Sequence, residues 1–153
     1  MATPAVLVTG GAGYVGSHAC KALSRAGFLP VTYDNLSRGH AWAVKWGPLE
    51  IGDILDVERL DAVMYAHRPI AALHFAAYAS IEESVRRPDL YYRNNLQGAV
   101  ALLEVLRVHQ VNRFVFSSTC AIYGVPQTER LSEDHPQEPL NAYGASKAMV
   151  ERV

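Results

Sequence analysis

Two motifs near opposite ends of the sequence contain residues that could do chemistry. Residues 10–16 read Gly-Gly-Ala-Gly-Tyr-Val-Gly, which places glycines at the spacing of a turn that holds a dinucleotide pyrophosphate. Tyr143 and Lys147 are four residues apart, so on a helix they would share a face. A cation beside a phenol favours the phenolate, which can accept a proton near neutral pH. Together the motifs indicate hydride transfer to a nicotinamide cofactor assisted by a tyrosine base.

The glycine motif lies between the elements that such a site needs. Residues 5–9 predict a buried parallel strand, and residues 14–26 predict a helix. In this arrangement Gly10 permits the tight turn, Gly13 lets the backbone approach the pyrophosphate, and Gly16 allows the helix to pack closely on the strand. The N-terminus of the helix would supply N–H groups for the anion.

Asp34 ends the next predicted strand, 31–34, where a carboxylate can accept hydrogen bonds from the ribose hydroxyls of the adenosine. The same carboxylate would repel a 2′-phosphate, so we expect NAD and not NADP. Arg38 lies nearby and is the one feature that would favour NADP. The plainer interpretation is a glycine-rich turn followed by a solvated aspartate. The order of strand, glycines, helix and acid favours the binding site.

A cluster of hydroxyl groups follows the predicted strand 113–117. Thr119 closes this cluster, at the strand end where ligands bind in open α/β sheets. Such clusters are more often ordinary loop residues, and a tyrosine and a lysine four apart are more often a packed ring beside a solvated amine. The hydroxyl cluster gains weight from its position at the strand end, and the tyrosine–lysine pair gains weight from the glycine turn elsewhere in the chain. Asn141 is expected to cap the helix that carries Tyr143.

Strands and helices are expected to alternate along the whole chain, which predicts a doubly wound parallel sheet of the Rossmann type. The remaining predicted strands cover residues 48–51 and 70–75, and the remaining helices cover 57–67, 89–109 and a segment starting near residue 141. We expect one NAD-binding domain over residues 1–153. The last helix stops without a cap or a following strand, as if the chain ended before the last strands and a substrate domain.

Composition points to an ordinary soluble protein. Among 153 residues, 50% are hydrophobic, and the net charge of −1 favours neither nucleic acid nor an anionic membrane as a partner. Cys20 and Cys120 have neither metal-ligand nor redox-motif spacing. No histidine pair has ligand spacing, so no metal is expected, and His74 is interpreted as a packed side chain. With no apparent signal peptide, we expect a cytoplasmic protein.

Several further motifs occur in a recognisable order. They cover residues 9–16, 34–36, 52–53, 74–77, 91–95, 117–119 and 143–147. With these motifs the chain resembles the extended short-chain dehydrogenase/reductase family, also called the NAD-dependent epimerase/dehydratase family, and within it the members that epimerise UDP-sugars at C4.

The resemblance implies a set of site residues. Thr119, Tyr143 and Lys147 would be the catalytic residues, and Thr119 and Tyr143 would contact the substrate. The implied contacts to NAD, taken with the glycine turn, are Gly10, Gly13, Tyr14, Val15, Gly16, Asp34, Asn35, Leu36, Asp53, Ile54, Phe75, Ala76, Ala77, Asn95, Tyr143 and Lys147.

The implied activity is the interconversion of UDP-galactose and UDP-glucose through a 4-keto intermediate, in the cytoplasm, with a homodimer expected for the full-length form. Alternatives are an epimerase for UDP-N-acetylglucosamine or UDP-arabinose, a chain that binds NAD without turnover, and an NADP-dependent reductase. Related dehydratases carry an acidic pair after the site hydroxyl, where this chain has Cys120 and Ala121. Ala79 replaces a lysine that some epimerases carry, and family members are considerably longer than this chain.

Overall fold

The computed structural model describes residues 3–153. Contacts divide the chain into two compact units. The first consists of the described residues up to Ala76 together with Ala101–Ser117, and the second consists of Ala77–Val100 and Ser118–Val153. The sheet lies in the first unit, and Tyr143 and Lys147 lie in the second. Within residues 3–153, no helix combines the length and the apolar character needed to cross a membrane.

The first unit is built on a five-stranded sheet in which every pairing is parallel. The strands are β1 (Ala5–Thr9), β2 (Leu29–Asp34), β3 (Leu49–Ile51), β4 (Ala71–His74) and β5 (Phe114–Phe116). Their order is β3-β2-β1-β4-β5, so the direction of winding reverses beside β1. The register pairs Thr9 with Tyr33 and with His74, near the carboxyl ends of β1, β2 and β4. This is the predicted doubly wound sheet, and ligands of such sheets bind at this reversal point.

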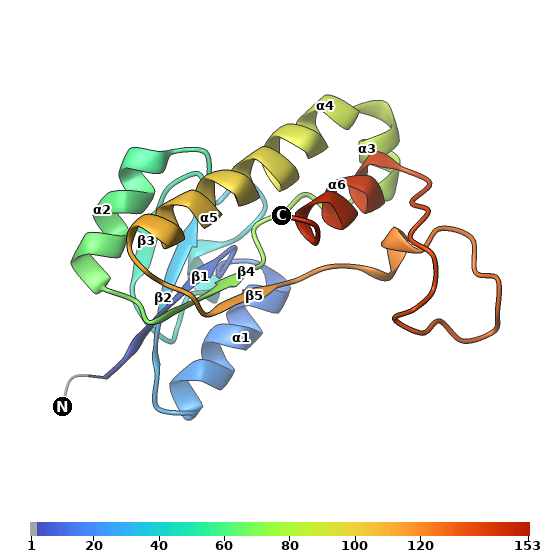
Figure 1. Cartoon of the computed structure of the whole chain (residues 1–153). Coiled ribbons are helices and arrows are strands. Elements are labelled where there is room, and N and C mark those ends of the chain that lie inside the picture. Colours follow the sequence, from blue (N-terminus) through green and yellow to red (C-terminus); the bar gives the residue numbers. More distant parts are fainter. Residues whose placement is uncertain (1–2) are drawn as a thin grey trace. The chain divides into compact units, whose positions relative to one another are not determined.

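Helices cover both faces of this sheet (Figure 1). On one face, alternate strand residues such as Leu7 and Val31 form a core with α2 (Val57–His67) and α5 (Gly98–Val108). On the other face, Val6 and Val8 pack with α1 (Tyr14–Arg25). Side chains alternate along β1, so this strand contributes residues to the core on each face of the sheet. Its sequence is a continuous apolar run because both of its faces are buried.

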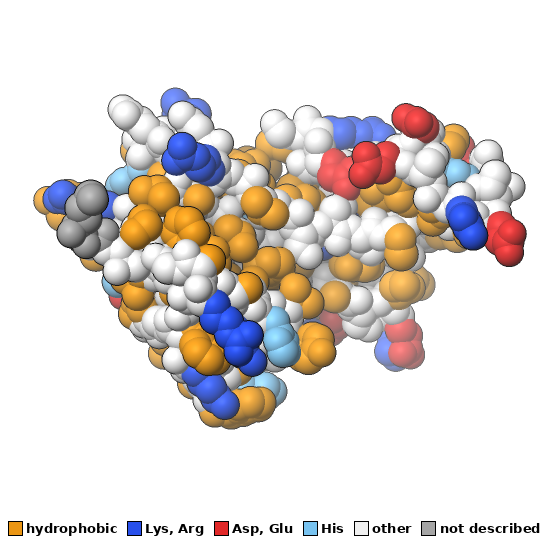
Figure 2. Space-filling model, turned by 90° about the horizontal axis from the view of Figure 1, so that it is seen from below, with side chains coloured by type: hydrophobic (Ala, Val, Ile, Leu, Met, Phe, Trp, Pro, Cys, Tyr) orange, Lys and Arg blue, Asp and Glu red, His pale blue; other side chains and the backbone are white. Residues whose placement is uncertain are grey.

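The face of the sheet on the α1 side is covered less completely beneath β4 and β5. Figure 2 looks onto this side and shows hydrophobic side chains gathered at the surface. Leu73 is half-buried, and Val115, its partner in the register, is 57% exposed. In a parallel sheet the two faces are normally both covered.

The second unit is helical. It contains α3 (Ile81–Arg86), α4 (Pro88–Tyr91), a π-helical turn η2 (Tyr92–Gln97), a short 3-10 helix η3 (Cys120–Ile122) and α6 (Ala142–Val150); a further 3-10 helix, η1 (Ala41–Ala43), belongs to the first unit. The long helical stretch predicted over 89–109 is present, although a π turn within it was not predicted. The helical segment starts at Pro88 and passes through the π turn before α5 begins. The short helix α3, capped by Ser80, was not predicted.

Candidate functional site

The glycine turn between β1 and α1 is closely packed. Gly10 has a φ of +73°, and a Cβ there would lie 2.5 Å from the backbone nitrogen of Ala76. A Cβ on Gly16 would lie 2.2 Å from the carbonyl oxygen of Gly10, so the first turn of the helix rests directly on the loop. Neither position accepts a side chain without rearrangement.

The N-terminus of α1 suits an anion. Its N-cap residue, Gly13, supplies no capping side chain, and the first turn contains no acidic residue. The first N–H groups of a helix have no partner within the helix, and together they carry a partial positive charge. Tyr14 and Val15 begin this helix with exposures of 83% and 56%. The turn therefore has the form and the charge of a pyrophosphate cradle.

Asp34 lies at the end of β2, beside this turn. It is 8% exposed, and its two oxygens accept hydrogen bonds from the backbone N–H groups of Ala12 (3.0 Å) and Leu36 (2.8 Å). The chain closes over it from the other side, because the N–H of His40 donates to the carbonyl of Ala12 at 3.0 Å and a Cβ on Gly39 would lie 3.0 Å from Oδ2 of Asp34. The carboxylate is therefore held in one orientation before any ribose arrives.

Asp53 is fixed from two sides. The amide of Asn35 donates to its carboxylate at 2.8 Å, and the hydroxyl of Tyr33 donates to its backbone carbonyl at 2.8 Å. Burial of Tyr33 raises the pKa of its hydroxyl, so the phenol stays protonated and remains a donor. The side chain of Ile54, by contrast, is 4% exposed within the core.

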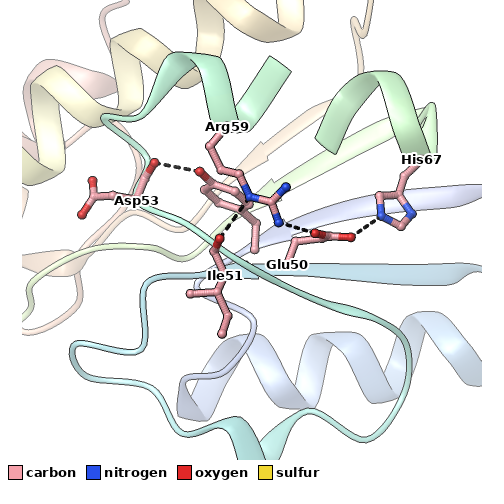
Figure 3. Close-up of polar contacts among 6 residues, drawn as sticks. Glu50, Ile51, Asp53, Arg59 and His67 are labelled. Carbon is pink, nitrogen blue, oxygen red and sulfur yellow. Dashed lines mark hydrogen bonds and ion pairs between the residues drawn. The ribbon is translucent and has the colours of Figure 1, made fainter. Parts of the chain in front are cut away.

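A polar cluster between β3 and α2 supports the segment that leads to Asp53 (Figure 3). The carboxylate of Glu50 interacts with the guanidinium of Arg59 and with Nε2 of His67, the latter at 2.7 Å. The hydrogen bond with His67, followed by that with Arg59, lowers the pKa of Glu50. Nε of Arg59 also donates to the carbonyl of Ile51 at 3.1 Å, which ties the end of β3 to the helix.

The remaining predicted cofactor residues of the first unit follow β4. The backbone of Phe75 and Ala76 lies against Gly10, as the distances from a Cβ on that glycine show. His74, at the end of the strand, is 1% exposed, contacts Oγ1 of Thr9 at 2.6 Å and stacks on Phe116. The prediction that His74 is a packed side chain is confirmed.

In the second unit, α6 carries both Tyr143 and Lys147. The side chain of Asn141 accepts a hydrogen bond from the N–H of Gly144 at 2.9 Å, which confirms the predicted N-cap. Tyr143 is half-buried, whereas Lys147 is 4% exposed. Burial lowers the pKa of the Lys147 ammonium from 10.5 to about 8. The amine is therefore still cationic at neutral pH, one helical turn from the phenol.

Thr119 caps the short helix η3, with its hydroxyl accepting from the N–H of Ala121 at 3.2 Å. This helix packs closely on α6: a Cβ on Gly144 would lie 2.5 Å from the carbonyl oxygen of Ala121. The glycine after Tyr143 thus lets the segment capped by Thr119 approach the first turn of α6. Within the described residues, the buried hydroxyl of the neighbouring Ser118 has no hydrogen-bond partner.

Asn95 lies in the π turn and is 1% exposed. Its Oδ1 accepts from the N–H of Tyr78 (2.8 Å) and from the amide of Asn94 (2.9 Å). Its Nδ2 donates to the carbonyl of Tyr78 (2.9 Å) and to Oγ of Ser146 (3.2 Å). Since a side-chain amide has two donor and two acceptor positions, the protein itself occupies all four. Ala77, the last of the predicted cofactor residues, begins this unit beside Tyr78.

Two residues around Tyr143 were not singled out from the sequence. Ser146 donates to the carbonyl of Tyr143 at 2.8 Å, and the ring of Tyr91 lies edge-on to the ring of Tyr143. The helical spacing of Ser146 from Tyr143 could have indicated the first contact. The second joins residues far apart in the sequence and has no local signal.

Comparison with known proteins adds independent information. Residues 6–153 match the model of the NAD dependent epimerase/dehydratase family. The UDP-glucose 4-epimerase of Rhizobium leguminosarum bv. trifolii is 51% identical over 153 residues, which are 100% of this chain and 47% of that protein. The chain spans about half the length of the curated relatives that it matches.

Solved structures give the same result. The UDP-glucose 4-epimerase of Brucella ovis in complex with NAD superposes with a TM-score of 0.96 at 47% identity, over 98% of this chain and 46% of that one. The UDP-Glc/GlcNAc 4-epimerase of Campylobacter jejuni has a TM-score of 0.93 at 36% identity, over 97% of this chain and 47% of that one.

Proposed function

The chain belongs to the NAD dependent epimerase/dehydratase family, and we propose that it supplies the cofactor-binding and catalytic residues of a UDP-sugar 4-epimerase that interconverts UDP-galactose and UDP-glucose. The observation that carries this proposal is the arrangement on α6. A phenol and a buried ammonium share this helix, and the segment capped by Thr119 packs against its first turn.

The first unit is proposed to hold NAD. The cradle formed by Gly10, Gly13 and Gly16 fits a pyrophosphate, since a side chain at the first or the last of these positions would occupy the space of the backbone. Asp34 would accept hydrogen bonds from the adenosine ribose hydroxyls through lone pairs not used by Ala12 and Leu36. The relative of known structure from Brucella ovis binds NAD, which agrees with this assignment.

The second unit is proposed to handle the proton. Bound NAD⁺ would supply the hydride acceptor for C4 of the sugar. Tyr143 would take the proton of the 4-hydroxyl as the C4–H bond breaks, and it would return a proton to the same oxygen when the 4-keto sugar is reduced on its other face. Thr119 would donate a hydrogen bond to that oxygen. The cationic Lys147 would lower the cost of forming the phenolate.

Other substrates remain as alternatives within the same mechanism. The relative from Campylobacter jejuni acts on both Glc and GlcNAc forms, so a UDP-N-acetylhexosamine is the second candidate, and UDP-arabinose is a third. Dehydration is disfavoured, because Cys120 and Ala121 follow Thr119 and neither is the acid or base that elimination of water requires. A chain that binds NAD without turning over sugar is the alternative of a different class.

The decisive experiment incubates the purified chain with UDP-galactose and measures UDP-glucose formation, with NAD content measured on the same sample. Conversion that is lost in Tyr143→Phe, with NAD content unchanged, supports the epimerase. NAD retained without conversion at high protein concentration supports the binding module instead. Preference for NADP would contradict the role of Asp34 and favour a reductase. The homodimer proposed for the full-length form is tested by its sedimentation mass.

A further inference from the structure

Tyr91 is a fully buried tyrosine in the second unit, with an exposure of 0%. Its hydroxyl oxygen accepts a hydrogen bond from the N–H of Ser80 at 3.0 Å, and its single proton has two acceptors within reach, the carbonyl of Ser80 at 2.7 Å and the carboxylate of Glu83 at 2.9 Å. The polar end of this side chain is thus anchored to both backbone groups of one residue and to the first turn of α3. These hydrogen bonds fix the position of the hydroxyl end of the buried side chain.

The anchored ring lies against Tyr143. The two ring centroids are 6.4 Å apart, and the ring planes meet at 80°, which is the edge-to-face arrangement that aromatic pairs prefer. The ring of Tyr78 also contacts that of Tyr91, with centroids 5.9 Å apart. The backbone of Tyr143 is held separately, since Ser146 donates to its carbonyl at 2.8 Å. That bond involves only the backbone of Tyr143, whereas Tyr91 contacts the side-chain ring.

We propose that Tyr91 is a positioning residue that holds the ring of Tyr143 in one orientation. The proposal rests on the function assigned to Tyr143 above, because a proton acceptor must present its oxygen to the substrate in a fixed direction. Tyr91 touches neither substrate nor cofactor in this scheme. It acts through the ring contact, and the hydrogen bonds to Ser80 and Glu83 make that contact rigid.

The test compares Tyr91→Leu, which removes the ring, with Tyr91→Phe, which keeps the ring and loses the anchor. Tyr92→Phe is the matched control, since the next residue is 37% exposed and belongs to no part of the proposed site. The readout is the NMR spectrum of the chain with ¹³C-labelled tyrosine, in which Tyr143→Phe identifies the Tyr143 ring signals. This measurement does not require turnover.

We expect Tyr91→Leu to shift and broaden the Tyr143 ring signals, Tyr91→Phe to do so less, and Tyr92→Phe to leave them unchanged. Where the wild-type chain converts UDP-galactose, kcat falls about two- to tenfold in Tyr91→Leu, with KM and NAD content unchanged. Unmoved Tyr143 signals in a folded Tyr91→Leu variant overturn the proposal. Shifted signals with an unchanged kcat also overturn it.

If Tyr91→Leu does not fold, the comparison of Tyr91→Phe with Tyr92→Phe decides: equal Tyr143 signals in these two variants overturn the proposal. If the wild-type chain retains NAD but shows no conversion at all, the NAD-binding module is favoured over the epimerase as the function of this chain. The NMR comparison still decides whether Tyr91 orients the Tyr143 ring. The two failures are therefore distinguishable.

Discussion

The buried side chain of Lys147 should make the free energy of unfolding depend on pH, and Lys147→Met should remove this dependence. The side chain is 4% exposed, and burial lowers its pKa from 10.5 to about 8. Because the pKa is lower in the folded state, the unfolded chain binds more protons between these two values. The free energy of unfolding therefore rises with pH across this window. The full difference of about 2.5 pH units corresponds to about 3 kcal/mol.

Lys147→Met isolates this effect, since methionine is an unbranched side chain without charge. Below about pH 8 the wild type bears the whole cost of the buried ammonium, and this cost disappears as the pH rises. Relative to Lys147→Met, the wild type should gain about 2 kcal/mol of unfolding free energy between about pH 8 and about pH 9.5. Urea unfolding at a series of pH values measures both proteins under identical conditions.

Lys45→Met is the matched control, because Lys45 is exposed and its ammonium is hydrated in both states. It removes an exposed lysine by the same substitution and serves as the reference for the Lys147→Met series. A difference between the wild type and Lys147→Met that stays constant from about pH 7 to about pH 9.5 would refute the burial of the charged amine. A similar slope in Lys45→Met would show that the trend does not come from Lys147.

Three further substitutions test the positions that shape the site. Gly10→Ala should lower the unfolding free energy by more than about 1 kcal/mol and abolish NAD binding, since φ is +73° and the new Cβ would meet Ala76; calorimetric NAD binding at wild-type affinity would contradict this. Asn141→Ala should lower the unfolding free energy by about 1 kcal/mol in urea unfolding, because the cap to Gly144 is lost; Asn141→Asp should retain most of it, and equal losses would argue against capping. Asp34→Ala should weaken NAD about tenfold without weakening NADP, measured by titration of both cofactors; an unchanged affinity ratio would remove Asp34 from the cofactor assignment.

Features with local causes could be predicted from the sequence. All five strands were expected, and the helix α2 (Val57–His67) begins and ends where its pattern indicated. The cap by Asn141 was also recognised, since capping depends on residues only a few positions apart. The fold class follows from these local elements, because alternating strands and helices leave few other ways to bury both faces of each strand.

Features caused by distant contacts could not be predicted in the same way. Nothing in the sequence around Asn95 interrupts a helical pattern, yet the helix widens into a π turn there, where the Asn95 amide pairs with the backbone of Tyr78 and with Ser146. The resemblance placed Asn95 among the cofactor contacts, and that role stays a prediction. The contact of Tyr91 with Tyr143 likewise joins two segments whose proximity only the fold provides.

The distribution of charge supports the site independently of any resemblance. Among residues 3–153, only two side chains of the Asp, Glu, Lys and Arg classes are buried, and they are Asp34 and Lys147. Elsewhere, ion pairs such as Arg86 with Glu82 lie on the surface, where charge is hydrated at little cost. Burying a charged side chain lowers the free energy of unfolding unless hydrogen bonds or an opposite charge compensate for the loss of hydration. Burial of charge does not by itself stabilise a fold. Two backbone N–H groups donate hydrogen bonds to Asp34, and burial lowers the pKa of Lys147. Asp34 is the acid proposed to bind the ribose, and Lys147 is the cation proposed to stabilise the phenolate. The two buried charges therefore lie where the proposed chemistry requires charge.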